Sequence, residues 1–282
     1  MKQDFSCAAA TYDEAAVLAR ETSRRMGERL DYVKLNPARI ADIGCASGDG
    51  IRDLQQRYPA ALPVAVDFSP AMLRQVWGRV PLLQRLTRRA PRLVNADALA
   101  LPLKGNSLGL VWSNLMLHWL DDPIPALREM HRVLEVDGLL MFAMLGPDTL
   151  KELRAACRDC GIEPPLRRFH DMHDIGDMLV AAGFADPVMD MEMLTLTYAG
   201  SHAARGLLRD QRHLGVRDAL LGQMPWRDWR RVLRAYAECR ADGVLPASFE
   251  IVYGHAWKPA PRVTDDGHAI IRFEKRVGLD QP

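Results

Sequence analysis

Residues 39–50 read RIADIGCASGDG, a short apolar run that ends directly in a loop of small residues. The run has the length and composition of a buried β-strand, and the glycines at 44, 48 and 50 favour a tight turn after it. Small residues let backbone N–H groups approach a ligand, and a helix that follows adds its positive N-terminal end. At this point the loop has three interpretations: a working cofactor loop, a degenerate one in which Ala46 replaces a glycine, or a plain turn.

The order of strand and helix repeats beyond this loop. The predicted strands are 39–43, 64–68, 92–97, 108–114 and 139–145, and the predicted helices are 13–33, 70–77 and 122–138. Pro70 is a favoured first residue of a helix. The strands are continuous apolar runs rather than alternating patterns, which indicates an α/β fold with a parallel sheet covered on both faces.

The last third of the chain adds two more strands around a helical stretch. Helices are predicted at 148–157 and 173–184, the second ending at Gly183, and strands at 186–198 and 248–258. If the first of these two strands runs parallel to the earlier strands and the second runs back beside it, the insertion 199–246 leaves from the carboxyl edge of the sheet, which carries the loop. It would then form a lid or wall over a pocket there.

Charge is concentrated in this insertion, although the whole chain carries a formal net charge of only +1. The insertion holds nine arginines against five acids; the arginines are Arg205, Arg209, Arg212, Arg217, Arg227, Arg230, Arg231, Arg234 and Arg240. A basic lid suits an acidic partner. The simpler interpretation is an exposed helix that happens to be rich in arginine.

Length and composition limit the organisation of the chain. Its 282 residues suffice for one large core, and its near-neutral charge gives no global field for nucleic acid or a membrane surface. We predict one domain over 1–258, with the lid 199–246 inside it, and a tail at 259–282. The beginning resembles no signal or transit leader, no run is long enough to span a membrane, and five irregularly spaced cysteines favour a cytoplasmic protein with reduced thiols.

Polar residues follow three further strands at the same predicted edge. Asp67 ends the second strand, where an acid can accept both hydroxyls of a ribose. Asp97 follows the third strand, where a carboxylate can accept the amino group of adenine, and Asn114 ends the fourth. Each alone could be a helix cap or a solvated turn, but four strand ends in register favour a nucleotide-type cofactor.

These motifs together, DIGCASG, AVDFSPAML, NADALALPL and SNLMLHWLDDP, resemble the class I S-adenosylmethionine-dependent methyltransferases. The resemblance implies a Rossmann-like seven-stranded sheet, mostly parallel with the last strand antiparallel, and a helical insertion between strands 6 and 7. It implies S-adenosylmethionine as the cofactor, with the loop holding its methionine part. Ala46 stands at the middle glycine of the loop, a change that costs little where φ is negative. A nicotinamide enzyme is disfavoured because its loop needs more glycines for a pyrophosphate. The implied cofactor residues are Asp42, Gly44, Ala46, Gly48, Asp67, Phe68, Met72, Asp97, Ala98, Asn114 and Leu115.

A narrower resemblance covers residues 5–259. FSCAAATYDEAAVLARE, RFHDMHDIGDML, LLRDQRHLGV and LPASFEIVYGHAWKP are similar to the malonyl-[acyl-carrier protein] O-methyltransferase family of biotin synthesis. The resemblance implies methylation of the free malonyl carboxylate on an acidic carrier protein. A sister group with a similar ending, a mitochondrial assembly factor of respiratory complex I described as an arginine hydroxylase, supplies the alternative of an accessory or modifying factor. A small-molecule methyltransferase of another specificity is the third possibility.

A malonyl carboxylate is ionised near neutral pH, so its methylation needs no general base. It does need a cation to orient it, preferably a forked guanidinium. We expect Arg209 and Arg212 to bind the carboxylate, and Tyr12 to lie in the segment that folds over the cofactor in similar enzymes. His118 and Trp119 either line the pocket or belong to the core.

Several patterns imitate metal or partner sites. Cys157 and Cys160 have zinc-knuckle spacing without a second pair, and adjacent helical turns give the same pattern. In the run 170–174, HDMHD, an N-cap by Asp171 is the better interpretation. We predict no metal site. The basic run 85–92 is either a partner contact or a solvated face, and the methionines at 189, 191 and 193 indicate core or strand-edge packing.

Overall fold

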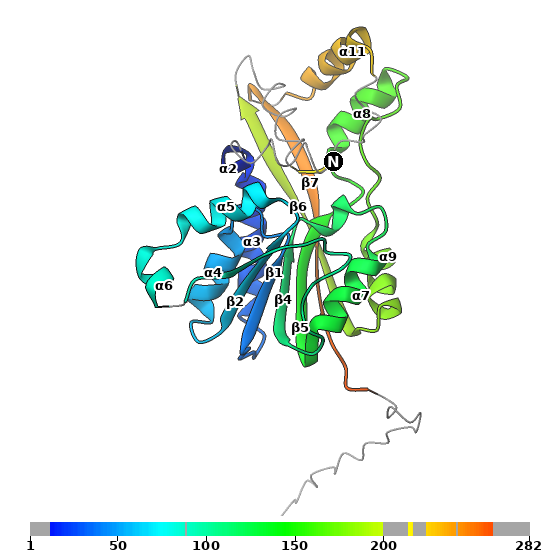
Figure 1. Cartoon of the computed structure of the whole chain (residues 1–282). Coiled ribbons are helices and arrows are strands. Elements are labelled where there is room, and N and C mark those ends of the chain that lie inside the picture. Colours follow the sequence, from blue (N-terminus) through cyan, green and yellow to red (C-terminus); the bar gives the residue numbers. More distant parts are fainter. Residues whose placement is uncertain (1–11, 88, 200–213, 217–223, 241, 262–282) are drawn as a thin grey trace, which may run out of the picture.

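The computed structural model describes residues 12–87, 89–199, 214–216, 224–240 and 242–261. In these ranges the chain forms a seven-stranded sheet with helices on both faces (Figure 1). The strands are β1 Arg39–Ile43, β2 Leu62–Asp67, β3 Arg92–Asn95, β4 Leu108–Asn114, β5 Leu134–Leu145, β6 Ala185–Ala199 and β7 Val244–Trp257. The helices are α2 Tyr12–Ala15, α3 Val17–Leu30, α4 Asp49–Arg57, α5 Pro70–Arg79, α6 Leu82–Leu86, the 3₁₀ turn η2 Leu117–Trp119, α7 Ile124–Val133, α8 Lys151–Asp159, α9 Met172–Ala181 and α11 Trp226–Ala237.

The strand order is β3-β2-β1-β4-β5-β7-β6. Pairing is parallel from β3 to β5, and β7 runs antiparallel to both of its neighbours, β5 and β6. The order reverses between β1 and β4, which is where an open parallel sheet binds its ligand, outside the carboxyl ends of the strands. The predicted fold class, including the antiparallel last strand, is confirmed.

Alternation along the strands divides the core into two layers. On β1, Ile40 faces the layer of α3, α4 and α5, whereas Ala41 and Ile43 face the layer of α7 and α9. All three are at most 1% exposed. Burial on both faces explains why the parallel strands read as continuous apolar runs.

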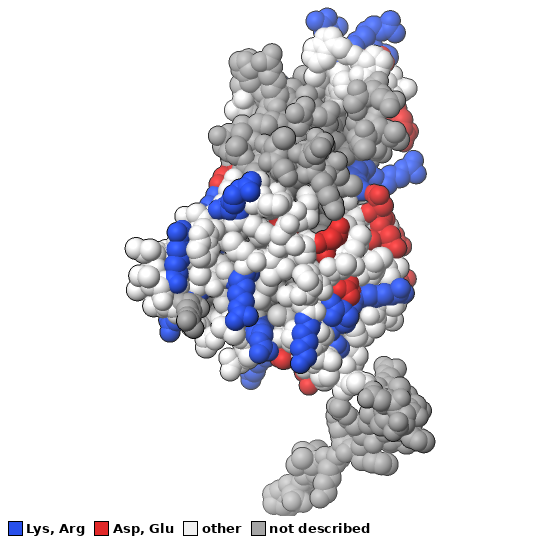
Figure 2. All heavy atoms as spheres, viewed as in Figure 1, with Lys and Arg blue, Asp and Glu red and all other residues white. Residues whose placement is uncertain are grey.

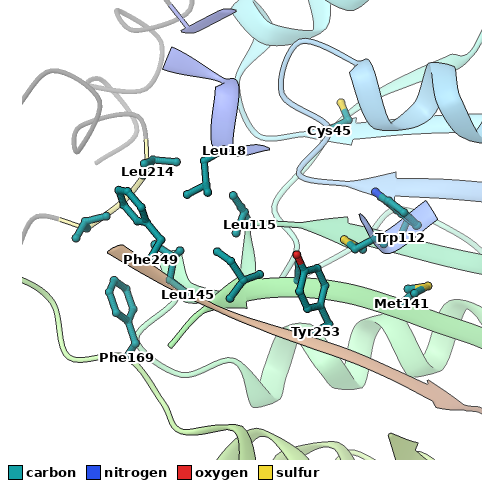
Figure 3. Close-up of a cluster of buried hydrophobic side chains, with 14 of the residues drawn as sticks. Leu18, Cys45, Trp112, Leu115, Met141, Leu145, Phe169, Leu214, Phe249 and Tyr253 are labelled. Atoms are coloured by element: carbon teal, nitrogen blue, oxygen red, sulfur yellow. The ribbon is translucent and has the colours of Figure 1, made fainter. Parts of the chain in front are cut away.

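Helix α3 packs its apolar stripe against the first layer, where Leu18, Met26 and Leu30 are buried. Figure 3 shows Leu18 beside Leu115 and Leu145, at the carboxyl ends of β4 and β5. The helix therefore lies along the sheet and reaches the edge at which a ligand is expected.

The predicted helix 122–138 is wrong at its end. Helix α7 ends at Val133, and β5 begins at Leu134, which pairs with Leu108 and is fully buried. The sequence LEVDG looks helical in isolation, but burying Leu134 in the sheet outweighs that local propensity. Asp137 then turns with a φ of +61°.

The insertion between the last two strands is shorter than predicted. Strand β6 continues to Ala199 and β7 begins at Val244, so residues 199 and 244–246 of the predicted insertion are paired strand. Of the two predicted helical pieces, the second is α11, which lies beyond α8 at one end of the molecule (Figure 1). Most of the first piece lies outside the described residues. No helix of the described ranges is long and apolar enough to cross a membrane.

Candidate active site

The loop after β1 alternates between left-handed and other backbone conformations. Gly44, Ala46 and Gly48 have φ angles of +80°, +45° and +90°. A Cβ on Gly44 would lie 2.4 Å from Cγ of Met116, so any other residue there would have to displace Met116 and adopt a strained backbone conformation. The spacing of two residues between small side chains follows from this alternation, because left-handed φ is where glycine is favoured.

Ala46 corrects the expectation of negative φ at the middle position. Its φ of +45° lies in the left-handed region, which costs a residue with a Cβ about 1 kcal/mol or more. The methyl group is nonetheless buried against Met72 and Tyr12. The alanine is therefore strained in its backbone and packed in its side chain.

Asp67 connects this loop to β2. One carboxylate oxygen accepts from the Ala46 N–H at 2.9 Å, and the other accepts from the Ser69 N–H at 2.8 Å. Ser69 in turn caps α5, which begins with Pro70 as predicted. Burial raises the pKa of Asp67, and these two donors oppose that shift. Each oxygen keeps a second lone pair, so the carboxylate can still accept from hydroxyl groups.

Asp42 lies at the end of β1, beneath the same loop. Burial and the neighbouring Asp67 raise its pKa to about 8, although the backbone N–H of Ile51 bonds to it. A Cβ on Gly50 would come within 2.7 Å of the Asp42 carboxylate, so the glycine lets the start of α4 approach this acid.

A pocket lies between α3 and the loop. Its lining comprises Tyr12 from α2; Ala16, Ala19, Arg20 and Ser23 from α2–α3; Asp42; loop residues 44–47; Asp49 and Gly50 from α4; and Asn114 from β4. Five of the predicted site residues thus meet here: Tyr12, Asp42, Gly44, Ala46 and Asn114.

The other predicted cofactor residues lie around this pocket or behind it. Met72 is fully buried against Ala46, and Gly48 is the N-cap of α4. Phe68 follows Asp67 and is half-buried. The structure does not bring Asp97, Ala98 and Leu115 into the pocket lining: Asp97 accepts from the Leu99 N–H, Ala98 packs on the α7 and α9 layer, and Leu115 belongs to the core.

Asn114 joins the pocket to α3. Its Nδ2 donates to the carbonyl oxygen of Ala19 at 2.8 Å, and its Oδ1 accepts from Oγ1 of Thr22 at 2.9 Å. The side chain therefore fixes the helix against the end of β4 while lining the pocket.

A second set of contacts fastens α2 over the loop. Asp13 accepts from Oγ of Ser47 at 2.9 Å, and its other oxygen pairs with Arg79 from the end of α5. Arg79 also donates to the carbonyl oxygen of Ser47 and pairs with Asp49. Tyr12, next to Asp13, is partly buried in this arrangement, and desolvation together with the neighbouring Asp67 raises its pKa above the ordinary value.

His118 belongs to the core rather than to a reacting centre. It is 3% exposed, its Nε2 lies 2.9 Å from the carbonyl oxygen of Leu214, and burial lowers its pKa to about 3. Its ring packs edge-on against Phe169 and near Trp119. Leu214 and Phe249 complete an apolar wall at this end of the sheet (Figure 3).

The lid arginines Arg209 and Arg212 lie outside the described residues. The N-cap interpretation of Asp171 is confirmed, because its side chain accepts from the His173 N–H at 2.8 Å at the start of α9. Among the described residues no group of three or more metal-ligating side chains is found. Cys157 lies buried in α8 and Cys160 at its end, both as free thiols.

Sequence reasoning missed Arg20, Ser23, Asp13 and Arg79. Arg20 and Ser23 could have been found from the helical spacing, because they share a helix face with the small residues at 16 and 19, and that face differs from the apolar stripe that packs on the sheet. The contacts of Asp13 and Arg79 depend on how α2 folds back, for which the sequence carries no local pattern.

Comparison with known proteins places these features in a family. Residues 41–142 match the model described as "Methyltransferase domain". The malonyl-[acyl-carrier protein] O-methyltransferase of Gallionella capsiferriformans is 51% identical, covering 98% of this chain and 96% of that protein. The protein of the same name from Laribacter hongkongensis is 48% identical, covering 97% and 94%.

Solved structures show the same fold at low identity. The YcgJ protein of Bacillus subtilis has a TM-score of 0.56 at 15% identity, covering 84% of this chain and 98% of that one. The putative methyltransferase in complex with the Haloferax volcanii Trm112 activator has a TM-score of 0.57 at 17% identity, covering 92% and 98%. At such identities the likeness shows the fold alone.

Proposed function

The chain belongs to the malonyl-[acyl-carrier protein] O-methyltransferase family, and from that premise we propose how its pocket and lid carry out the reaction. The protein is an S-adenosylmethionine-dependent O-methyltransferase that methylates the free carboxylate of malonyl-[acyl-carrier protein], the step that supplies the methyl ester for biotin synthesis. The observation that carries this conclusion is the similarity along nearly the whole chain, lid included, rather than in the cofactor half alone.

The described residues fit S-adenosylmethionine. The loop 44–48 approaches with small side chains, Asp67 retains acceptor capacity for ribose hydroxyls, and Ser23 carries a buried hydroxyl that has no hydrogen-bond partner. When bound, the cofactor supplies an electrophilic methyl group on a sulfonium. We propose that the residues in and around the pocket bind it, namely Asp42, Gly44, Ala46, Gly48, Asp67, Phe68, Met72 and Asn114. Asp97, Ala98 and Leu115 lie outside the pocket lining and are assigned to it by the resemblance alone.

The protein itself has to align the malonyl carboxylate with the methyl group of the cofactor and to exclude water from the site. The malonyl carboxylate is already an anion, so no side chain has to remove a proton from it. Leu115, Leu214 and Phe249 present an apolar wall at the carboxyl ends of the strands, and Tyr12 with the fastened α2 covers the loop. We propose that Arg209 and Arg212 orient the carboxylate from the lid.

The carrier protein is the partner, and we propose that its acidic surface meets the basic lid. On α11, Arg227, Arg230 and Arg234 are exposed, and Figure 2 shows blue side chains gathered at this tip of the molecule. We place the reaction in the cytoplasm, where Cys45, Cys157, Cys160 and Cys239 remain free thiols.

The activity is tested by incubating the protein with methyl-labelled S-adenosylmethionine and malonyl-carrier protein. We expect label in a base-labile methyl ester on the carrier. Cofactor binding without any transfer would contradict the proposal, and hydroxylation of an arginine in a respiratory-complex protein would support the alternative.

The assignment of the lid arginines needs a separate variant. Arg209→Ala should abolish methylation while S-adenosylmethionine still binds, and Arg217→Ala, in the same insertion, is the matched control. Turnover at the wild-type rate in Arg209→Ala would exclude that residue from the substrate site.

A further inference from the structure

The pocket is asymmetric, because one wall is a face of the α3 segment and the other is the loop. Ala16, Ala19, Arg20 and Ser23 lie three or four residues apart and therefore share that face. The two alanines let the helix approach closely, so Arg20 and Ser23 are the groups on this wall that can bind a ligand through polar atoms of their side chains.

Ser23 carries a hydroxyl that nothing in the described protein satisfies. The residue is 5% exposed, its Oγ is buried, and no hydrogen-bond partner is within reach. Burying such a group without a hydrogen-bond partner is unfavourable. A hydroxyl in the lining of a pocket, left without a partner, is available to a bound ligand.

Arg20 differs from the other arginines of its helix. Arg24, Arg25 and Arg29 each pair with a carboxylate. The Arg20 guanidinium donates through Nη1 to the carbonyl oxygen of Asp13 at 3.1 Å, and within the described part of the chain no carboxylate lies within 4 Å of it. The Arg20 guanidinium can therefore pair with an anion of a bound ligand.

The opposite wall offers carboxyl oxygens as hydrogen-bond acceptors, although the raised pKa of Asp42, about 8, keeps that group protonated near neutral pH. Asp42 and Asp49 lie on the loop side of the same pocket, and Asp49 is already paired with Arg52 and Arg79. A ligand that is only cationic would suit this wall but would be repelled by Arg20. A ligand with a carboxylate and an ammonium on one carbon suits both walls, with the carboxylate toward α3.

We propose that Arg20 and Ser23 bind the α-carboxylate of the amino-acid end of S-adenosylmethionine, an inference that rests on the proposed cofactor. The guanidinium supplies the charge, and the Ser23 hydroxyl donates a hydrogen bond to a carboxylate oxygen. These two residues select ligands that carry the carboxylate, whereas Asp67 binds the ribose of the adenosyl part that all such ligands share.

The test compares three ligands by calorimetry: S-adenosylmethionine, decarboxylated S-adenosylmethionine and methylthioadenosine. The wild type should bind the first about tenfold or more tightly than the second, since a charge-assisted pair contributes about 1.4 kcal/mol or more. Arg20→Ala should remove this preference and leave the affinity for methylthioadenosine unchanged. Ser23→Ala should reduce the preference a few-fold.

Arg24→Ala, on the outer face of the same helix, is the matched control and should keep the full preference. Arg20→Lys keeps the positive charge but loses the planar guanidinium, and should retain part of the preference for S-adenosylmethionine over its decarboxylated form. If Arg20→Ala weakens all three ligands equally, or if the wild type does not distinguish the first two, the inference is wrong. A wild type that binds none of the three would instead contradict the proposed cofactor.

Discussion

At the scale of single residues, Ala46 shows how a loop can depart from its glycine pattern. The left-handed φ favours glycine, while the buried methyl group packs on Met72. Because these effects oppose each other, Ala46→Gly should change the free energy of unfolding by no more than about 1 kcal/mol.

A branched side chain at the same position has no such compensation. Ala46→Val should destabilise the protein by about 2 kcal/mol or more and weaken S-adenosylmethionine binding, because β-branched residues are least tolerated at positive φ. Urea denaturation and cofactor titration measure both effects, with Ala46→Gly as the matched control. Equal stability of Ala46→Val and the wild type would contradict the backbone conformation described here.

Asp42 gives the protein a pH dependence. Its pKa in the folded state is raised from 3.8 to about 8, first by burial and then by Asp67. The folded state therefore holds this proton more tightly than the unfolded state does. The resulting contribution to stability is fully present below about pH 4 and is lost as the pH rises through about 8.

Asp42→Asn removes this titration and keeps an oxygen that can accept from the Ile51 N–H. Between pH 5 and pH 8 we expect the free energy of unfolding of the wild type to fall relative to that of the variant, by about 1.4 kcal/mol for each unit of pH. Denaturant unfolding at the two pH values measures the difference. Parallel pH profiles for the two proteins would show that Asp42 does not titrate in this range.

At the scale of elements, the position of α3 depends on its contact with β4. Thr22 is fully buried and donates to Asn114 at 2.9 Å without lining the pocket. Thr22→Val leaves the Asn114 oxygen unsatisfied, which should cost about 1–3 kcal/mol of stability. Arg20 and Ser23 belong to the same helix, so a shift of that helix should also lower the affinity for S-adenosylmethionine.

Thermal unfolding and calorimetry together test this coupling. Thr87→Val, whose hydroxyl donates to the Leu83 carbonyl oxygen near α6, is the matched control and should alter neither property much. A Thr22→Val protein that is destabilised but binds the cofactor as tightly as the wild type would separate the helix from the pocket.

The sequence predicted the elements whose pattern is local. Strands β1, β2 and β4 were found because burial on both faces makes them apolar runs, and the acids at their ends because they follow these runs directly. The end of α7 was missed because pairing with Leu108, a tertiary contact, decides it. The φ of Ala46 and the α3 wall of the pocket were missed for the same reason.

At the scale of the whole molecule, basic groups on α11 lie far along the chain from the cofactor loop. Reversing three exposed charges, Arg227→Glu with Arg230→Glu and Arg234→Glu, should raise the KM for malonyl-carrier protein about tenfold or more at low salt. Cofactor affinity should stay the same.

Steady-state kinetics at several salt concentrations distinguish this role from a loss of folding. The wild type should lose kcat/KM steeply as salt rises, and the triple variant should not. Arg128→Glu, an exposed site on α7, is the control. Equal salt dependence in wild type and triple variant would place the carrier elsewhere.

The position of β7 inside the sheet has a consequence for synthesis of the chain. β7 lies between β5 and β6, although it is the last of the described strands to leave the ribosome, and β6 pairs with no other strand in the described sheet. The cofactor half from β1 to β5 can form parallel pairs as soon as it emerges. The Met-rich, β-prone sequence of β6 stays unpaired until the residues of β7, Val244–Trp257, have been synthesised. A nascent chain stalled before Val244 therefore leaves β6 and the outer edge of β5 unpaired, and we expect such a chain to be prone to aggregate.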